Sequence, residues 1–163
     1  MNFREPRGAS PIGNFTLSKE ELDTFLNSTP YCTLSFFSVN GYPGVTPINY
    51  AWDGEYFYVH CAKKGERFES LAKNPKVSIC VYEPSDNLHQ YIADHKSVVA
   101  YGDAELLTPE ESVVPLQKMC LATAMPHKAK LEYIEKRIAM IVCYRIKPLH
   151  IIGRIVKFGG IQP

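Results

Sequence analysis

Residues 31–61, YCTLSFFSVNGYPGVTPINYAWDGEYFYVHC, hold three runs of strand-like composition that are separated by two turn signals. The first two runs, 31–39 and 44–52, are separated at Asn40-Gly41, and the third run begins after Asp53-Gly54. Asn-Gly and Asp-Gly between strand-like runs are the strongest short-range signals of a hairpin. The stretch therefore predicts two consecutive hairpins and an antiparallel sheet.

Short helices are predicted on either side of this stretch. Ser18 and Glu21 form a capping box that begins a helix ending before Thr29-Pro30, and a second capping box begins a helix after Thr108. Two further helices are expected after Gly65 and over 127–137. Pro115 is expected to kink or shorten the helix that contains it, because proline removes a helical hydrogen bond.

Four more strands are predicted from apolar runs: 76–82, 96–107, 139–146 and 149–158. We expect Lys147-Pro148 to separate the last two and Gly102 to mark a bulge. The expected fold class is mainly β, with six or seven antiparallel strands and a few short helices. Aromatic antiparallel strands in this number close into a small β-barrel, which hides the strand edges.

The length and ends of the chain favour one domain preceded by an arm. Prolines and glycines interrupt residues 1–15, so we expect an irregular N-terminal arm there, including Gly13. Residues 16–163 are expected to form a single domain, which fits the usual size of one.

Composition argues against several classes of protein. The net charge of +1 does not favour a dedicated nucleic-acid binder, and no apolar run approaches the ~20 residues of a membrane span. The five cysteines form no C-x-x-C pair and no zinc-like spacing, so we expect no metal site. Reduced thiols and the lack of a signal-peptide pattern predict a cytoplasmic protein.

A basic turn, residues 63–67, follows the third strand of the opening stretch. It contains Lys63, Lys64 and Arg67 around Gly65, at the expected start of a helix. Free N–H groups at a helix start and nearby cations together suit a phosphate group. A solvated, charged turn without a ligand is the alternative.

The order of several short motifs resembles the pyridoxamine-phosphate-oxidase-like flavin-binding split barrels, most closely the branch that contains nitroimidazole-resistance proteins. The motifs are Pro47-Ile48-Asn49-Tyr50, His60-Cys61-Ala62, Gly65-Glu66-Arg67, Asn74-Pro75-Lys76-Val77 and residues 97–111. The resemblance covers about residues 18–156. Glu66 departs from the family pattern, in which a basic residue is common at that position.

The resemblance implies an antiparallel split barrel of the FMN-binding type, which forms a homodimer with FMN in clefts at the subunit interface. Residues 46–50 and 60–62 would then lie along the flavin ring, while the basic turn would bind its phosphate. The implied cofactor-binding residues are Thr46, Pro47, Ile48, Asn49, Tyr50, His60, Cys61, Ala62, Lys63, Lys64, Arg67 and Arg154. Tyr50 has the alternative of being a core residue.

The function implied by the resemblance is an FMN-dependent oxidoreductase that reduces a small organic acceptor. A nitroaromatic compound is one such acceptor, as in a 5-nitroimidazole reductase, and NAD(P)H is one donor. His60 would be the catalytic residue, because imidazole transfers protons near neutral pH; a purely structural histidine is the alternative. Two other functions stay open: a non-catalytic flavin-binding or sensor protein, and a split barrel that binds haem or a deazaflavin.

Overall fold

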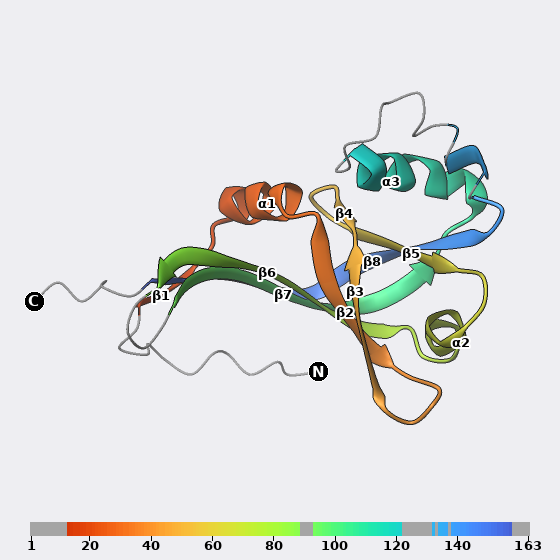
Figure 1. The fold of residues 1–163 in the computed structure, drawn as a ribbon, viewed down its shortest axis with the longest axis horizontal. Coiled ribbons are helices and arrows are strands. Elements are labelled where there is room, and N and C mark those ends of the chain that lie inside the picture. The colour runs from red at the N-terminus through yellow and green to blue at the C-terminus, as the bar shows by residue number, and fades with distance from the viewer. Residues whose placement is uncertain (1–12, 89–92, 122–131, 133, 137, 158–163) are drawn as a thin grey trace, which may run out of the picture.

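The computed structural model describes residues 13–88, 93–121, 132, 134–136 and 138–157 (Figure 1). Its strands are β1 (Gly13–Thr16), β2 (Tyr31–Phe37), β3 (Pro43–Asn49), β4 (Ala51–Trp52), β5 (Phe57–Ala62), β6 (Lys76–Leu88), β7 (Ala93–Leu106) and β8 (Ile141–Lys157). Its helices are α1 (Lys19–Ser28), α2 (Glu66–Lys73) and α3 (Pro109–Leu121).

The strands form one sheet in the order β3-β2-β6-β7-β8-β5-β4, and β1 pairs with the C-terminal end of β8. All of these ladders are antiparallel. β2 and β3 form the first predicted hairpin, and β4 and β5 form the second. The run 44–52 is not the single strand that was predicted, because it is divided at Tyr50 into β3 and β4, which lie at opposite ends of the sheet. The sheet curls into a split barrel, which confirms the predicted mainly β fold class.

The barrel is open between the two ends of this path. Among the described residues, no ladder joins β3 to β4 or β5. β4 pairs only with the first residues of β5, Phe57 and Tyr58. β3 and the rest of β5 therefore each have an edge whose backbone N–H and C=O groups lack a strand partner. We call the space between these edges the split.

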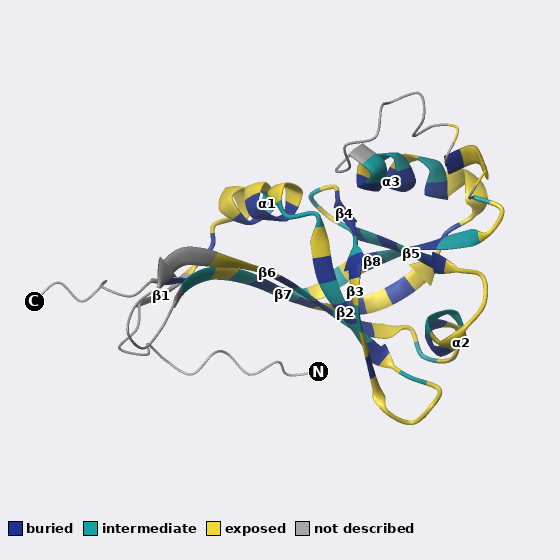
Figure 2. Ribbon diagram, in the orientation of Figure 1, coloured by how far each residue is buried: buried dark blue, intermediate teal, exposed yellow. Residues whose placement is uncertain are grey.

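Alternating side chains fill the interior of the barrel. In β2, Cys32, Leu34 and Phe36 are buried, whereas the residues between them are exposed or half-buried. α1 contributes Leu22 and Leu26 to the same core. Figure 2 shows the buried faces of α1 and α3 turned toward the strands and their exposed faces turned outward.

A second, smaller core lies on the outer side of the sheet, beneath α3. It contains Leu116 and Met119 of α3, and Cys143 of β8, which is fully buried. Because alternate residues of a strand face opposite sides, His60 of β5, which lies opposite Cys143, faces this outer side.

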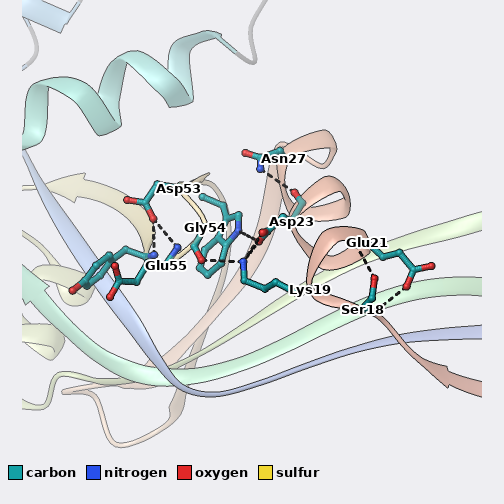
Figure 3. A network of polar contacts seen from close by, with 10 residues as sticks. Ser18, Lys19, Glu21, Asp23, Asn27, Asp53, Gly54 and Glu55 are labelled. Carbon is teal, nitrogen blue, oxygen red and sulfur yellow. Dashed lines mark hydrogen bonds and ion pairs between the residues drawn. The ribbon is translucent and has the colours of Figure 1, made fainter.

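Polar contacts hold α1 against the turn between β4 and β5 (Figure 3). Asp23 forms an ion pair with Lys19 and accepts a hydrogen bond of 2.7 Å from the indole nitrogen of Trp52. Lys19 also donates to the carbonyl of Gly54 at 3.1 Å. Tyr50 donates its hydroxyl to the carbonyl of Leu26 at 2.8 Å. Tyr50 and Trp52 are thus both part of the interior.

Two further predictions of secondary structure are wrong, and a third is wrong in part. Gly13 and the residues after it do not continue an arm but pair with β8 as β1. β8 runs through Pro148 as one strand, because a shift in its register with β7 leaves Leu149 outside the pairing. α3 continues through Pro115 to Leu121 without being shortened.

Other local predictions are confirmed. Ser18 caps α1 in a capping box with Glu21, and Thr108 does the same with Glu111 at the start of α3. The register shift at Gly102 is the predicted bulge. Most of the helix predicted over 127–137 lies outside the described residues, although residue 132 and residues 134–136 are helical.

Replacing Gly102 by alanine should lower the free energy of unfolding by about 2 kcal/mol. A Cβ atom at this position would lie 2.5 Å from the carbonyl oxygen of Lys147, so the bulge would have to shift. Urea unfolding measures the loss. The control is Asp103→Ala on the same strand, which removes only an exposed ion pair with Lys76 and should change stability by less than about 0.5 kcal/mol. Equal stability of the two variants would contradict the prediction.

Candidate functional site

Two adjoining clefts lie at the split of the barrel. The α2 cleft has a volume of 460 Å³ and is lined by Phe36, Pro43, Gly44, Val45, Thr46, Cys61, Ala62, Lys64, Gly65, Glu66, Arg67 and Phe68. The β5 cleft has a volume of 520 Å³ and is lined by Tyr31, Pro47, Ile48, Asn49, His60, Cys61, Ala62, Arg67 and Ile141. Both clefts are bordered by β3 on one side and β5 on the other. Cys61, Ala62 and Arg67 line both, so the clefts form one continuous site.

The basic turn forms one wall of the α2 cleft. Gly65 is the N-cap of α2 and has a φ of 99°, a conformation that glycine adopts without strain. The N–H groups of the first helical residues have no partner within a helix. Lys64 is exposed and Arg67 is half-buried in the same wall. The wall therefore combines unpaired N–H groups, the positive end of a helix dipole and two cations.

Glu66 lies in this wall, but its carboxylate is bound by the β2–β3 turn. It accepts hydrogen bonds from the hydroxyl of Ser38 and, at 2.9 Å, from the side-chain amide of Asn40. The departure of Glu66 from the family pattern is therefore accommodated by partners on the neighbouring hairpin.

His60 lines the β5 cleft, and one of its ring nitrogens is unsatisfied. Its Nδ1 atom is buried and has no hydrogen-bond partner among the described residues. Leaving such an atom unpaired costs about 1–3 kcal/mol, which a ligand that hydrogen-bonds to it would recover. Burial, and secondarily the Arg67 guanidinium, hold the pKa of His60 below its ordinary value of 6.5. The imidazole is therefore mostly neutral at pH 7.

Cys61 contributes volume rather than a reactive thiol. Its side chain belongs to the main core, and burial raises its pKa, although Arg67 acts in the opposite direction. A thiol with a raised pKa is a poor nucleophile at neutral pH. None of the five cysteines, all of which lie in the described residues, forms a disulfide.

The structure brings together nine of the residues predicted for the site. They are Thr46, Pro47, Ile48, Asn49, His60, Cys61, Ala62, Lys64 and Arg67. Three others lie outside the two linings. Tyr50 is buried in the core, and Lys63 uses its backbone N–H to bond Met140. Arg154 pairs with Ser97 near the other end of β8. It is separated along the strand by about 36 Å, at ~3.3 Å per residue, from Cys143, the residue of β8 that pairs with His60.

Sequence reasoning missed several lining residues, most clearly Tyr31 and Ile141. Tyr31 lies opposite Asn49, and Ile141 lies opposite Ala62, in the strands beside those predicted. The alternation of β2 could have indicated Tyr31, because it shares a face with Thr33 and Ser35 rather than with the buried residues. Ile141 belongs to β8, which the sequence does not connect to the site.

Some other types of site find no support in the described part of the chain. It contains no group of three His, Cys, Asp or Glu residues that could hold a metal ion. None of its helices has the length and apolar character of a membrane span.

A family model described as pyridoxamine 5′-phosphate oxidase matches residues 18–155. The chain belongs to this family. The match spans both clefts and all of the sheet except β1 and the last residues of β8, and it confirms the family that the motifs indicated.

Several proteins of known structure share the fold of this chain at low sequence identity. A candidate 5-nitroimidazole antibiotic resistance protein from Bacteroides thetaiotaomicron is 15% identical, with a TM-score of 0.70 and 95% of each chain covered. A FAD-binding protein from Mesorhizobium loti is 22% identical, with a TM-score of 0.63, covering 90% of this chain and 99% of that one. A FAD- and haem-binding protein from Mycobacterium smegmatis is 15% identical, with a TM-score of 0.66, covering 89% of this chain and 74% of that one. No curated protein sequence matches the chain.

The ligand-free protein should lose more stability than a His60→Gln variant as the pH falls below about 6.5. The folded protein holds the pKa of His60 below its ordinary value of 6.5, so the unfolded chain binds a proton that the folded protein does not. Protons therefore favour unfolding in this range, whereas His60 has no such effect above it. Urea unfolding from pH 8 to pH 5 measures the difference. Parallel losses in the two proteins would contradict the prediction.

Proposed function

We propose that the chain binds FMN at the split and uses it to reduce a small organic acceptor. One observation carries the proposal. The cationic start of α2 and His60, whose buried Nδ1 has no hydrogen-bond partner among the described residues, line the same pair of adjoining clefts. Each cleft has a volume within the range of about 300–1,000 Å³ that is usual for ligand pockets.

The α2 cleft fits the phosphate end of FMN. Gly65 lets the backbone approach a ligand closely, and a Cβ atom there would meet nothing within 4 Å. Arg67 would supply two parallel donors and Lys64 a second charge. The Glu66 carboxylate keeps its negative charge in this wall, but one of its oxygens is bound to Ser38 and Asn40 on the neighbouring hairpin.

The β5 cleft fits the flavin ring. Pro47 and Ile141 give it apolar walls, and Tyr31 adds an aromatic side chain that is 65% exposed. The free edges of β3 and β5 offer backbone donors and acceptors, which suit the polar atoms at the rim of the ring. His60 offers Nδ1 as a further partner.

FMN supplies hydride or electron transfer when it is bound, and the protein supplies binding, orientation and proton transfer. His60 is the residue of the site that would exchange a proton with the acceptor. A nitroaromatic compound is the acceptor that the sequence motifs favour. NAD(P)H would dock transiently as the donor, since the sequence has no glycine-rich dinucleotide fingerprint.

We further propose that two copies of the chain pair across the face on which the β5 cleft opens. Large apolar side chains are exposed on this face, including Tyr31, Val45 and Tyr101. Val45 and Tyr101 lie on the same face of the sheet. Val45 pairs with Ser35, Ser35 pairs with Ser78, and Ser78 pairs with Tyr101 on neighbouring strands. A partner on this face would cover the flavin and could bring its own Arg154 to the site. Sedimentation at micromolar concentration tests the pairing.

Five cysteines without a disulfide agree with a reducing compartment, so we propose that the protein acts in the cytoplasm. A haem-binding split barrel is the second candidate function, because His60, a candidate haem ligand, lines the β5 cleft and its buried Nδ1 has no hydrogen-bond partner among the described residues. The visible spectrum of the purified protein separates the two cofactors.

Replacing both Lys64 and Arg67 by alanine should leave a folded, nearly colourless protein. Loss of two charge-assisted contacts should weaken FMN binding by about a hundredfold or more. Flavin absorbance per polypeptide and titration with FMN measure the effect. The control is Lys73→Ala with Lys76→Ala, which removes the same charge at the last residue of α2 and at the first residue of β6. Full flavin occupancy in the first variant would contradict the proposed phosphate site.

His60→Gln should retain FMN but slow acceptor reduction by about a hundredfold. If protonated His60 donates the proton, turnover of the natural protein should rise as the pH falls through the lowered pKa, below about 6.5. The variant should lack this rise. Stopped-flow oxidation of the reduced flavin by a nitroaromatic acceptor, from pH 5 to pH 8, measures both. Identical pH profiles would assign His60 a structural role.

A further inference from the structure

The two walls of the α2 cleft are connected at one end by hydrogen bonds between the β2–β3 turn and α2. The Glu66 carboxylate accepts from Ser38 and Asn40, as described above. Ser70, one turn further along α2, is fully buried and accepts a hydrogen bond of 3.0 Å from the backbone N–H of Val39. We call these three bonds the hairpin–helix contact.

The partners of Glu66 are also the residues that shape the turn. Asn40 donates its backbone N–H to the hydroxyl of Ser38 at 3.1 Å. The side-chain oxygen of Asn40 accepts from the N–H of Tyr42 at 2.9 Å. Binding to Glu66 therefore orients side chains that already determine the path of the backbone into β3.

We propose that Glu66 is a positioning residue that sets the α2 cleft by holding the β3 wall against the first turn of α2. Residues 43–46 and 64–68 form the opposite walls of this cleft. The hairpin–helix contact joins residues 38–40, which precede the β3 wall in the chain, to Glu66 within the α2 wall and to Ser70 just after it. What the cleft holds rests on the proposed function.

The proposal predicts the opposite change in FMN affinity on removal of Glu66 from the change that its charge alone would cause. A carboxylate in the wall of an anion site repels the anion, so removal of Glu66 should tighten FMN binding if charge is its only influence. If Glu66 positions the wall, removing its hydrogen bonds should weaken binding in spite of the lost repulsion. Gln separates the two effects, because its side-chain oxygen can still accept from both Ser38 and Asn40 while carrying no charge.

The test compares Glu66→Gln with Glu66→Ala, which remove the same charge. FMN titration should give Glu66→Gln an affinity within about threefold of the natural protein, and Glu66→Ala an affinity about tenfold weaker than Glu66→Gln. Ser38→Ala, which keeps the charge of Glu66, should also weaken binding. Equal affinity of the Gln and Ala variants, or tighter binding by the Ala variant, would overturn the proposal.

Glu69 provides the matched control on the same turn of α2. It is exposed, and among the described residues it has no side-chain partner on the hairpin. Glu69→Gln and Glu69→Ala should bind FMN equally well, since neither removes a contact between the walls. A tenfold difference between them would mean that alanine acts through the helix start itself, which would overturn the assignment to Glu66.

Amide hydrogen exchange of the ligand-free protein separates this proposal from the proposed function. Residues 39–45 should exchange faster in Glu66→Ala than in the natural protein or in Glu66→Gln. If the natural protein does not bind FMN, the proposed function fails while this measurement still decides whether Glu66 holds the hairpin. Unchanged exchange of residues 39–45 in Glu66→Ala would overturn the proposal. Faster exchange of these residues without a loss of FMN affinity in Glu66→Ala would overturn it as well.

Discussion

Two strand edges that do not meet determine where this protein can bind a ligand. β3 and β5 lie toward the two ends of the sheet, and the backbone groups along their edges at the split have no strand partners among the described residues. Water or a ligand must satisfy such groups, because an unpaired polar group that is buried costs free energy. Both clefts lie between these edges, and the cationic helix start and His60 lie beside them. The open sheet thus places several unsatisfied groups in one region.

Arg67 connects the two halves of the site electrostatically. It lines both clefts, and its charge adds to burial in lowering the pKa of His60. The same guanidinium that suits a phosphate thus helps to keep the neighbouring imidazole neutral. Glu66 contrasts with Arg67, because its negative charge would disfavour an anion in the cleft. Its carboxylate instead accepts hydrogen bonds from Ser38 and Asn40 on the β2–β3 turn. The position of each charged side chain relative to its partners decides its effect.

Much of the fold follows from local signals in the sequence. Asn40-Gly41 and Asp53-Gly54 mark the positions of the two turns, and capping boxes specify the starts of α1 and α3. The segments 46–49 and 60–62 could be assigned to one site because the motif order resembles a known family. Local signals misled where a distant strand decided the outcome, as for Pro148, which is accommodated by a register shift against β7.

The sequence by itself determined the hairpins, the helix starts, the family and the residues of the basic turn, because each depends on neighbours within a few positions or on motif order. Only the tertiary structure decided that Tyr50 is a core residue, that Tyr31 and Ile141 line the β5 cleft, and that the Glu66 carboxylate faces the β2–β3 turn. These outcomes depend on contacts between segments far apart in the chain. The direction of a side chain follows from the partners that folding brings to it, and no local pattern specifies those partners.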